Sequence, residues 1–151
     1  MQPVQTVLIV EDDPIVRAYA MEMFQSQGWR VMETYNAERA LQLLDAHAGE
    51  IDLVFTDVRM PGEMNGLGLA QLLKRLHPGL KVILSSGYDG DAEHGFAFLP
   101  KPWSPQVLKR LLGQETPTTA NRRPGRSWSW PRSAQGLAGA DAQSKLTGSF
   151  R

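Results

Sequence analysis

The sequence predicts an α/β protein built on a doubly wound, five-stranded parallel sheet with one shortened helix. Over residues 1–113, short apolar runs alternate with segments whose apolar residues recur at helical spacing. This alternation is typical of right-handed βαβ units, which build parallel sheets. The apolar runs are also continuous rather than alternating, as expected for strands that helices bury on both faces.

The first half of the predicted domain contains two strands and two helices. Residues 7–10 form an uninterrupted apolar run and are expected to be the first strand. Asp13, which precedes a proline, has the residue type of a helix N-cap, and Gly28 is expected to stop that helix. A second strand is predicted over 29–34, after which Asn36 is expected to cap the second helix.

The second half contributes three more strands. The third is predicted over 51–56, and four leucines at helical spacing mark the helix that follows it: Leu69, Leu72, Leu73 and Leu76. The fourth strand is expected at 81–84 and the fifth at 96–99. Ser104, again followed by a proline, is expected to cap the last helix.

Two stretches depart from the repeating pattern. Only residues 87–95 link the fourth and fifth strands, which leaves room for a single helical turn near residues 91–94 instead of a crossover helix. Residues 114–151 are rich in Gly, Pro, Ser, Thr and Arg and are predicted to be a disordered tail. The basic and aromatic stretch at 122–130 is interpreted as solvated rather than nucleic-acid-binding. We therefore divide the chain into a domain over 1–113 and a tail over 114–151.

The composition excludes several classes of site. None of the 151 residues is cysteine, so disulfides, thiolate metal ligands and cysteine nucleophiles are excluded. The 16 basic and 16 acidic side chains balance, so the net charge gives no argument for a nucleic-acid or membrane partner. Because the sequence has neither a signal-peptide pattern nor an apolar run long enough to span a membrane, we expect a cytoplasmic protein.

Side chains that carry chemistry gather where the predicted strands end. In a parallel sheet the carboxyl ends of the strands form one edge, where ligands generally bind. That edge is expected to hold Glu11, Asp12, Asp13, Asp57, Ser85, Ser86 and Lys101. Several carboxylates at one edge repel each other, so the arrangement predicts a divalent cation that prefers oxygen ligands, Mg²⁺ or Mn²⁺. The ammonium group of Lys101 and a serine hydroxyl are suited to contact a phosphoryl group carried by one carboxylate.

Some polar residues have simpler explanations. Asp13, directly before a proline, is interpreted as a helix cap only. A single acidic residue after a strand is commonly a cap or a solvated loop charge, whereas acidic, hydroxyl and ammonium groups at successive strand ends are hard to explain by chance. His47, His77 and His94 lack the spacing of metal ligands and are interpreted as surface residues.

Three segments, in order, resemble the signature sequences of response-regulator receivers, the CheY-like superfamily of two-component systems. They cover residues 7–14, 57–62 and 101–102, and the resemblance extends over about residues 5–113. It implies a flavodoxin-like (β/α)5 fold and a role in phosphorelay signal transduction. A receiver accepts a phosphoryl group from a sensor histidine kinase or a phosphotransfer protein and thereby changes its contacts with a downstream protein.

The resemblance also implies which residues carry the chemistry. Asp57 corresponds to the phospho-accepting aspartate, and Lys101 corresponds to the lysine that pairs with the phosphoryl oxygens. The implied cofactor is Mg²⁺, with ligands from Glu11, Asp12, Asp57 and the backbone carbonyl of Arg59. Such neighbours matter because a carboxylate attacks a dianionic phosphoryl group poorly unless cations neutralise the developing charge. The bond between Lys101 and the proline after it is expected to be cis, as is usual in the family.

Two further residues match the conformational switch of the family. Ser86 corresponds to the hydroxyl-bearing residue that contacts the phosphoryl group, although the adjacent Ser85 stays open as an alternative. Ser86 is favoured because Gly87 follows it. Phe98 occupies the position where the family often has an aromatic ring that moves inward on activation.

The chain departs from the usual receiver pattern at two places. The loop over residues 61–66 is one residue longer than the commonest form, which is a small change. The stretch over 86–101 is several residues shorter, which implies a reduced or lost fourth helix. That helix often belongs to the output and dimerisation surface of receivers. We therefore expect this chain to stay largely monomeric when phosphorylated.

The receiver interpretation is preferred to two others. An aspartate-nucleophile phosphatase of the haloacid dehalogenase type usually has a second Asp two residues after the nucleophile, where this chain has Arg59. A degenerate receiver, which would interact with partners without phosphorylation, is disfavoured because every site position holds a competent residue. We expect a phospho-acceptor that assists its own phosphotransfer and slow dephosphorylation but is not otherwise an enzyme. The stretch after residue 113 is expected to be too short for a DNA-binding or enzymatic output domain.

Overall fold

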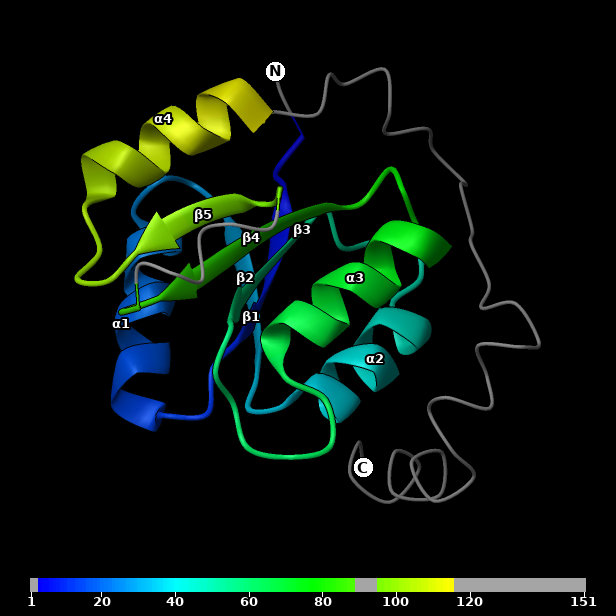
Figure 1. Cartoon of the computed structure of the whole chain (residues 1–151). Helices are drawn as coiled ribbons and strands as arrows, with labels where there is room; N and C mark the ends of the chain where they lie inside the picture. The colour runs from blue at the N-terminus through cyan, green and yellow to red at the C-terminus, as the bar shows by residue number, and fades with distance from the viewer. Residues whose placement is uncertain (1–2, 89–94, 116–151) are drawn as a thin grey trace.

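The computed structural model describes residues 3–88 and 95–115, and a five-stranded parallel sheet lies at its centre (Figure 1). The order of the strands across the sheet is β2-β1-β3-β4-β5, which is the flavodoxin-like order. The predicted α/β class with a doubly wound parallel sheet is therefore confirmed. The strands are β1 (Thr6–Val10), β2 (Arg30–Thr34), β3 (Leu53–Asp57), β4 (Lys81–Ser86) and β5 (Ala97–Pro100).

Helices cover both faces of this sheet. The described residues contain four of them: α1 (Pro14–Gln25), α2 (Ala37–Ala46), α3 (Gly66–Leu76) and α4 (Pro105–Glu115). In Figure 1, α1 and α4 lie on one side of the sheet, and α2 and α3 lie on the other. The chain runs from β1 outward to β2 and then returns to β3 on the opposite side of β1, so the loops that follow β1 and β3 diverge. Such a reversal of strand order creates a crevice at the carboxyl edge of the sheet, where ligands of this class of fold bind.

Alternate residues of β1 point into two separate parts of the core. Leu8 and Val10 pack in the cluster beneath α2 and α3, whereas Val7 and Ile9 pack in the cluster beneath α1 and α4. All four side chains are fully buried. The continuous apolar run in the sequence therefore reflects burial on both faces, as expected for a central parallel strand.

The helix starts agree with the caps predicted from the sequence. The carboxylate of Asp13 accepts hydrogen bonds from the backbone N–H groups two and three residues later, at 2.8 and 3.2 Å. The Asn36 side chain accepts one from the N–H three residues later at 2.8 Å, and the Ser104 hydroxyl accepts a similar bond at 3.3 Å. Gly28 follows α1 with a φ of +87°, a left-handed conformation that glycine adopts without strain.

The bounds of all five strands differ slightly from the predicted ones; β1 begins one residue earlier, at Thr6, and β2 one residue later, at Arg30. β3 begins at Leu53 and includes Asp57, and β5 is shifted by one residue toward the C-terminus. The expectation that Ser85 and Ser86 follow the fourth strand is wrong, because both belong to β4. They pair there with residues 99 and 100 of β5. Pairing with a neighbouring strand extends β4 through two polar residues whose own sequence does not favour a strand.

Some predictions lie outside the described residues. The helical turn near residues 91–94 falls in the undescribed stretch between β4 and β5. Most of the predicted tail, residues 116–151, is also outside the described residues. Residues 114 and 115 complete α4, which thus runs two residues past the predicted domain boundary. Among the helices that the structure describes, none combines the length and hydrophobicity needed to cross a membrane.

Candidate functional site

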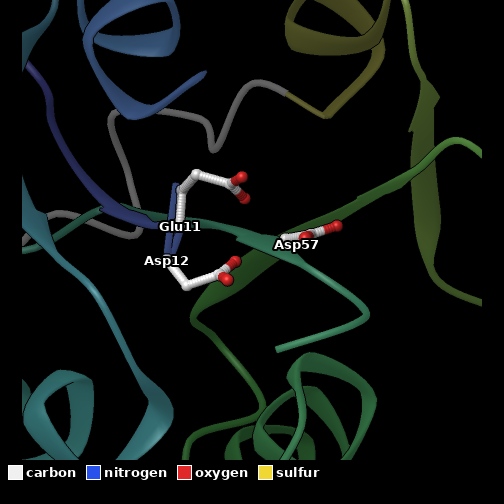
Figure 2. A group of neighbouring side chains, drawn as sticks. All are labelled: Glu11, Asp12 and Asp57. Carbon is white, nitrogen blue, oxygen red and sulfur yellow. The ribbon is translucent and has the colours of Figure 1, made fainter. Parts of the chain in front are cut away.

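Three carboxylates meet at the carboxyl edge of the sheet. Glu11 and Asp12 directly follow β1, and Asp57 is the last residue of β3, its neighbour in the sheet. One oxygen from each carboxylate lies within 4.8 Å of the others. Figure 2 shows the side chains of Glu11 and Asp12 extending toward the end of β3, where Asp57 lies. Of the four acidic residues predicted at this edge, the structure brings together Glu11, Asp12 and Asp57, while Asp13 caps α1.

Lys101 adds a positive charge to this group. Its Nζ lies 3.6 Å from Glu11 Oε1 and 3.5 Å from Asp57 Oδ1. The backbone N–H of Lys101 donates to the carbonyl of Ser86 at 3.0 Å, which ties the residue to the end of β4. The peptide bond between Lys101 and the proline after it is cis, as expected.

Burial and charge set the protonation behaviour of the two inner carboxylates. Glu11 is 4% exposed and Asp57 is 9% exposed, whereas Asp12 faces solvent. Burial, together with repulsion from Asp57, raises the pKa of Glu11 to about 7. Burial also raises the pKa of Asp57 above its ordinary value, although the charge of Lys101 opposes that rise. Three carboxylates thus lie together with one lysine at this site.

The residues at this edge fit a divalent cation of the Mg²⁺ type. The donor set consists of carboxylate oxygens, which are the hard ligands that Mg²⁺ prefers. A cation would also oppose the burial and the repulsion from Asp57 that together raise the pKa of Glu11. Arg59 lies two residues after Asp57, at the exposed beginning of the β3–α3 loop, and its guanidinium stacks 4.7 Å from the ring centroid of Tyr88.

The two serines of β4 are held by different partners. The Ser86 hydroxyl accepts a hydrogen bond from the backbone N–H of Tyr88 at 3.0 Å. The Ser85 hydroxyl accepts one from the indole N–H of Trp103 at 2.6 Å. Because successive strand residues point to opposite faces, the two hydroxyls lie on opposite sides of the sheet. Phe98 of β5 is half-buried and packs against an apolar cluster on the α3 side.

Comparison with known proteins agrees with this geometry. A family model for the response regulator receiver domain matches residues 7–112. The chain belongs to this family. Among curated proteins, it is 42% identical over 113 residues to the sensor kinase CckA of Brucella abortus, and 33% identical over 126 residues to the transcriptional regulator NtrC of Azospirillum brasilense. These matches cover 70% and 76% of this chain but only 12% and 26% of those relatives.

Solved receiver structures also resemble this chain. The receiver domain of the hybrid histidine kinase CckA has a TM-score of 0.59 at 35% identity, with 73% of this chain and 97% of that chain covered. A response regulator receiver protein from Pseudomonas putida has a TM-score of 0.63 at 25% identity, with 76% and 99% covered. The receiver fold expected from the signature segments is thereby confirmed.

Two residues that support this receiver site were missed by the sequence analysis. Arg17 donates from Nη1 to the backbone carbonyl of Glu11 at 2.8 Å, and its Nε lies 3.5 Å from a carboxylate oxygen of Glu33 in β2. Gly66 begins α3 against the backbone of Asp57, and its N–H donates to the carbonyl of residue 58 at 2.9 Å. The only sequence signal for Gly66 was the asparagine before it, whose side chain caps α3.

Replacing Gly66 with alanine is expected to destabilise the receiver by about 2–3 kcal/mol, the cost of forcing extra atoms into a packed site. A Cβ at this position would overlap the backbone carbonyl of Asp57. Thermal unfolding of Gly66→Ala and Gly68→Ala measures the effect. Gly68→Ala is the control, because its added Cβ would contact only the flexible Met64 side chain and the Asn65 side chain. Equal melting temperatures for both variants would show that the close approach at Asp57 is not needed.

The metal-free receiver is expected to lose stability as the pH rises from about 4.5 to about 7. In this interval Glu11 stays protonated in the folded state, where burial raises its pKa to about 7, but ionises in the unfolded state, where its pKa has the ordinary value of 4.5. Ionisation then favours unfolding. In thermal melts in EDTA, the melting temperature of Glu11→Gln should therefore rise relative to that of the wild type as the pH increases. Glu22→Gln, on the exposed side of α1, is the control. A Glu11→Gln profile parallel to that of the wild type would contradict the raised pKa.

Proposed function

We propose that this receiver accepts a phosphoryl group on Asp57 from the phosphohistidine of a sensor histidine kinase or a phosphotransfer protein. The observation that carries the proposal is the position of the Asp57 carboxylate, which lies within 4.8 Å of oxygens of Glu11 and Asp12 and 3.5 Å from Lys101 Nζ. The proposed Mg²⁺ ligands are Glu11, Asp12, Asp57 and the backbone carbonyl of Arg59. Phosphotransfer from a histidine kinase would take place in the cytoplasm, where we propose that the chain acts.

The proposed reaction is a substitution at phosphorus. An oxygen of the Asp57 carboxylate attacks the phosphorus atom, an O–P bond forms and the N–P bond of the phosphohistidine breaks. The electron pair of the broken bond stays on the donor imidazole nitrogen, which then takes up a proton. Mg²⁺, when bound, would neutralise charge on the phosphoryl oxygens. Lys101, at 3.5 Å from Asp57, supplies a second positive charge at this carboxylate.

The same site accounts for slow dephosphorylation of the receiver. Water attacks the phosphorus of the acyl phosphate, the O–P bond to Asp57 breaks, and the carboxylate is restored while inorganic phosphate leaves. Lys101 stabilises the charge that develops on the phosphoryl oxygens in this step as well. The chain thus takes part in phosphotransfer without acting as an enzyme on any other substrate.

The proposed output is a change in affinity for another protein. A phosphoryl group on Asp57 draws the hydroxyl of Ser86 toward it, and the space that is vacated admits the ring of the half-buried Phe98. Inward movement of this ring would alter the surface at β5. Because few residues link β4 to β5, we expect this surface to recruit a different protein rather than a second copy of the chain. Light scattering with and without beryllofluoride checks the monomeric state.

Beryllofluoride, an analogue of a phosphoryl group, provides a test of the proposal. Added with Mg²⁺ to the full chain, it should give bound ¹⁹F resonances and shift the amide signals of residues around Asp57, and EDTA should reverse both effects. These effects are expected because the analogue needs the carboxylate and a cation together. If the folded chain showed no bound signal at saturating Mg²⁺, the proposal would be overturned in favour of an interaction module that works without phosphorylation.

A further inference from the structure

Trp103 occupies a central position beside the phosphorylation site, two residues after Lys101. Its indole ring packs against Phe55 of β3 with centroids 5.4 Å apart and against Tyr19 of α1 with centroids 5.6 Å apart. The Phe55 contact has the edge-to-face geometry that aromatic pairs prefer, whereas the Tyr19 contact is tilted, with 38° between the ring planes. The ring is therefore fixed from two sides, by the sheet and by the helix that follows the acidic pair.

A hydrogen bond fixes the third side of the indole. Its N–H donates to the Ser85 hydroxyl at 2.6 Å, and Ser85 is fully buried. Ser85 lies directly opposite Asp57 in the pairing of β3 with β4, and its carbonyl accepts from the backbone N–H of Val58 at 2.9 Å. The serine that anchors the indole thus also holds the backbone at the end of β3.

The face of the fixed indole contacts the lysine of the site. Lys101 Nζ lies 5.6 Å from the centroid of the Trp103 ring, within the range of a cation–π interaction. The same Nζ lies 3.5 Å from Asp57 and 3.6 Å from Glu11. The ammonium group is therefore held among two carboxylates and one aromatic ring. A lysine side chain has many rotamers, so each such partner reduces the number of positions that the ammonium group can take.

We propose that Trp103 is a positioning residue for Lys101 and that Ser85 anchors Trp103 instead of acting as the switch. This inference rests on the proposed acceptance of a phosphoryl group by Asp57. In the absence of the phosphoryl group, the ring keeps the ammonium group beside the acceptor carboxylate. When the phosphoryl group arrives, its oxygens draw Lys101 away from the ring, and the environment of the indole changes. Tyr19, half-exposed on α1, contacts the same ring, so this change extends to the surface of α1.

Two substitutions in the full chain test the positioning role. Trp103→Phe retains an aromatic ring but weakens the cation–π contact and removes the anchoring hydrogen bond. It should accept a phosphoryl group from acetyl phosphate about threefold more slowly than the wild type. Ser85→Ala should slow acceptance by a similar factor, and the double variant should be no slower than either single variant, because both act through one contact. Trp29→Phe, in the same apolar cluster but away from Lys101, is the matched control.

The Mg²⁺ dissociation constant separates positioning from general packing. None of these substitutions alters a carboxylate of the site, so the constant should stay within about twofold of the wild-type value. Trp103→Phe accepting phosphate as fast as Trp29→Phe would overturn the positioning role, and so would a slower rate matched by an equal loss of Mg²⁺ affinity. If the wild type accepted no phosphoryl group, the proposed function would fail first, which is a different result.

The indole resonance of Trp103 gives a second measurement. The chain has four tryptophans, and Trp103→Phe identifies the signal by its disappearance from a ¹H–¹⁵N spectrum. Ser85→Ala should move this signal in the metal-free protein, where phosphorylation plays no part. Beryllofluoride with Mg²⁺ should move it in the wild type as Lys101 leaves the ring. A signal that responds to neither change would contradict the inference.

Discussion

Replacing Asp57 with asparagine is expected to abolish phosphoryl incorporation from acetyl phosphate. The amide has nearly the shape of the carboxylate but no nucleophilic oxygen of comparable reactivity, so the site should stay folded and remain unphosphorylated. Removal of the Asp57 charge ends the ion pair with Lys101, but it also relieves the repulsion that, together with burial, raises the pKa of Glu11. Intact-mass measurement after treatment with acetyl phosphate and Mg²⁺ detects the incorporation directly.

A matched control for Asp57→Asn lies just before the same strand. Asp52 precedes β3, and its carboxylate accepts a hydrogen bond from the backbone N–H of Thr6 at 2.7 Å, a bond that asparagine can also accept. Asp52→Asn should therefore incorporate phosphate like the wild type. If Asp57→Asn gained a phosphoryl group as readily as Asp52→Asn, the acceptor would lie elsewhere in the chain.

Replacing Asp12 with alanine is expected to weaken Mg²⁺ binding more than about tenfold. Substitution of a residue that only supports a metal ligand already lowers metal affinity by about this factor. The same change at Asp13 should leave the Mg²⁺ dissociation constant unaltered. The Asp13 carboxylate accepts two backbone hydrogen bonds at the start of α1 and is outside the group of three carboxylates that meet at the sheet edge. Its loss should instead cost about 1 kcal/mol of folding stability, as is typical of an N-cap.

Titration with Mg²⁺, followed by NMR, and thermal unfolding separate these two aspartates. The expected pattern is a crossed one, in which Asp12→Ala affects the titration and Asp13→Ala affects the melting temperature. Equal losses of Mg²⁺ affinity at both positions would mean that the acidic pair lies one residue later than we propose.

The local parts of this fold could be predicted from the sequence because their signals are local. Asp13 and Asn36 carry cap side chains that act within three residues, and the run at residues 7–10 is apolar because helices cover both faces of β1. The end of β4 could not be predicted in this way. Ser85 and Ser86 form part of the strand because neighbouring strands pair with them: Ser85 lies opposite Asp57 of β3, and both serines pair with β5, which lies beyond the loop that follows.

The same distinction applies to the site. Glu11, Asp57 and Lys101 could be placed together because parallel strands end at a common edge and these residues stand at strand ends. The roles of Gly66 and Trp103 could not, because they depend on contacts across the sheet edge that no local pattern encodes. Gly66 packs on the backbone of Asp57, and the Trp103 indole reaches a serine 18 positions earlier in the chain.

Chemical mapping of the phosphoryl group tests the central claim most directly. An acyl phosphate is reduced by borohydride to an alcohol, so a phosphorylated aspartate becomes homoserine and can be located by peptide sequencing in a mass spectrometer. After treatment of the full chain with acetyl phosphate and Mg²⁺, we expect homoserine at position 57 and at no other aspartate. The conversion should disappear when EDTA replaces Mg²⁺. Homoserine at Asp12 or Asp13, or none at position 57 in a chain that has gained a phosphoryl group, would contradict the account.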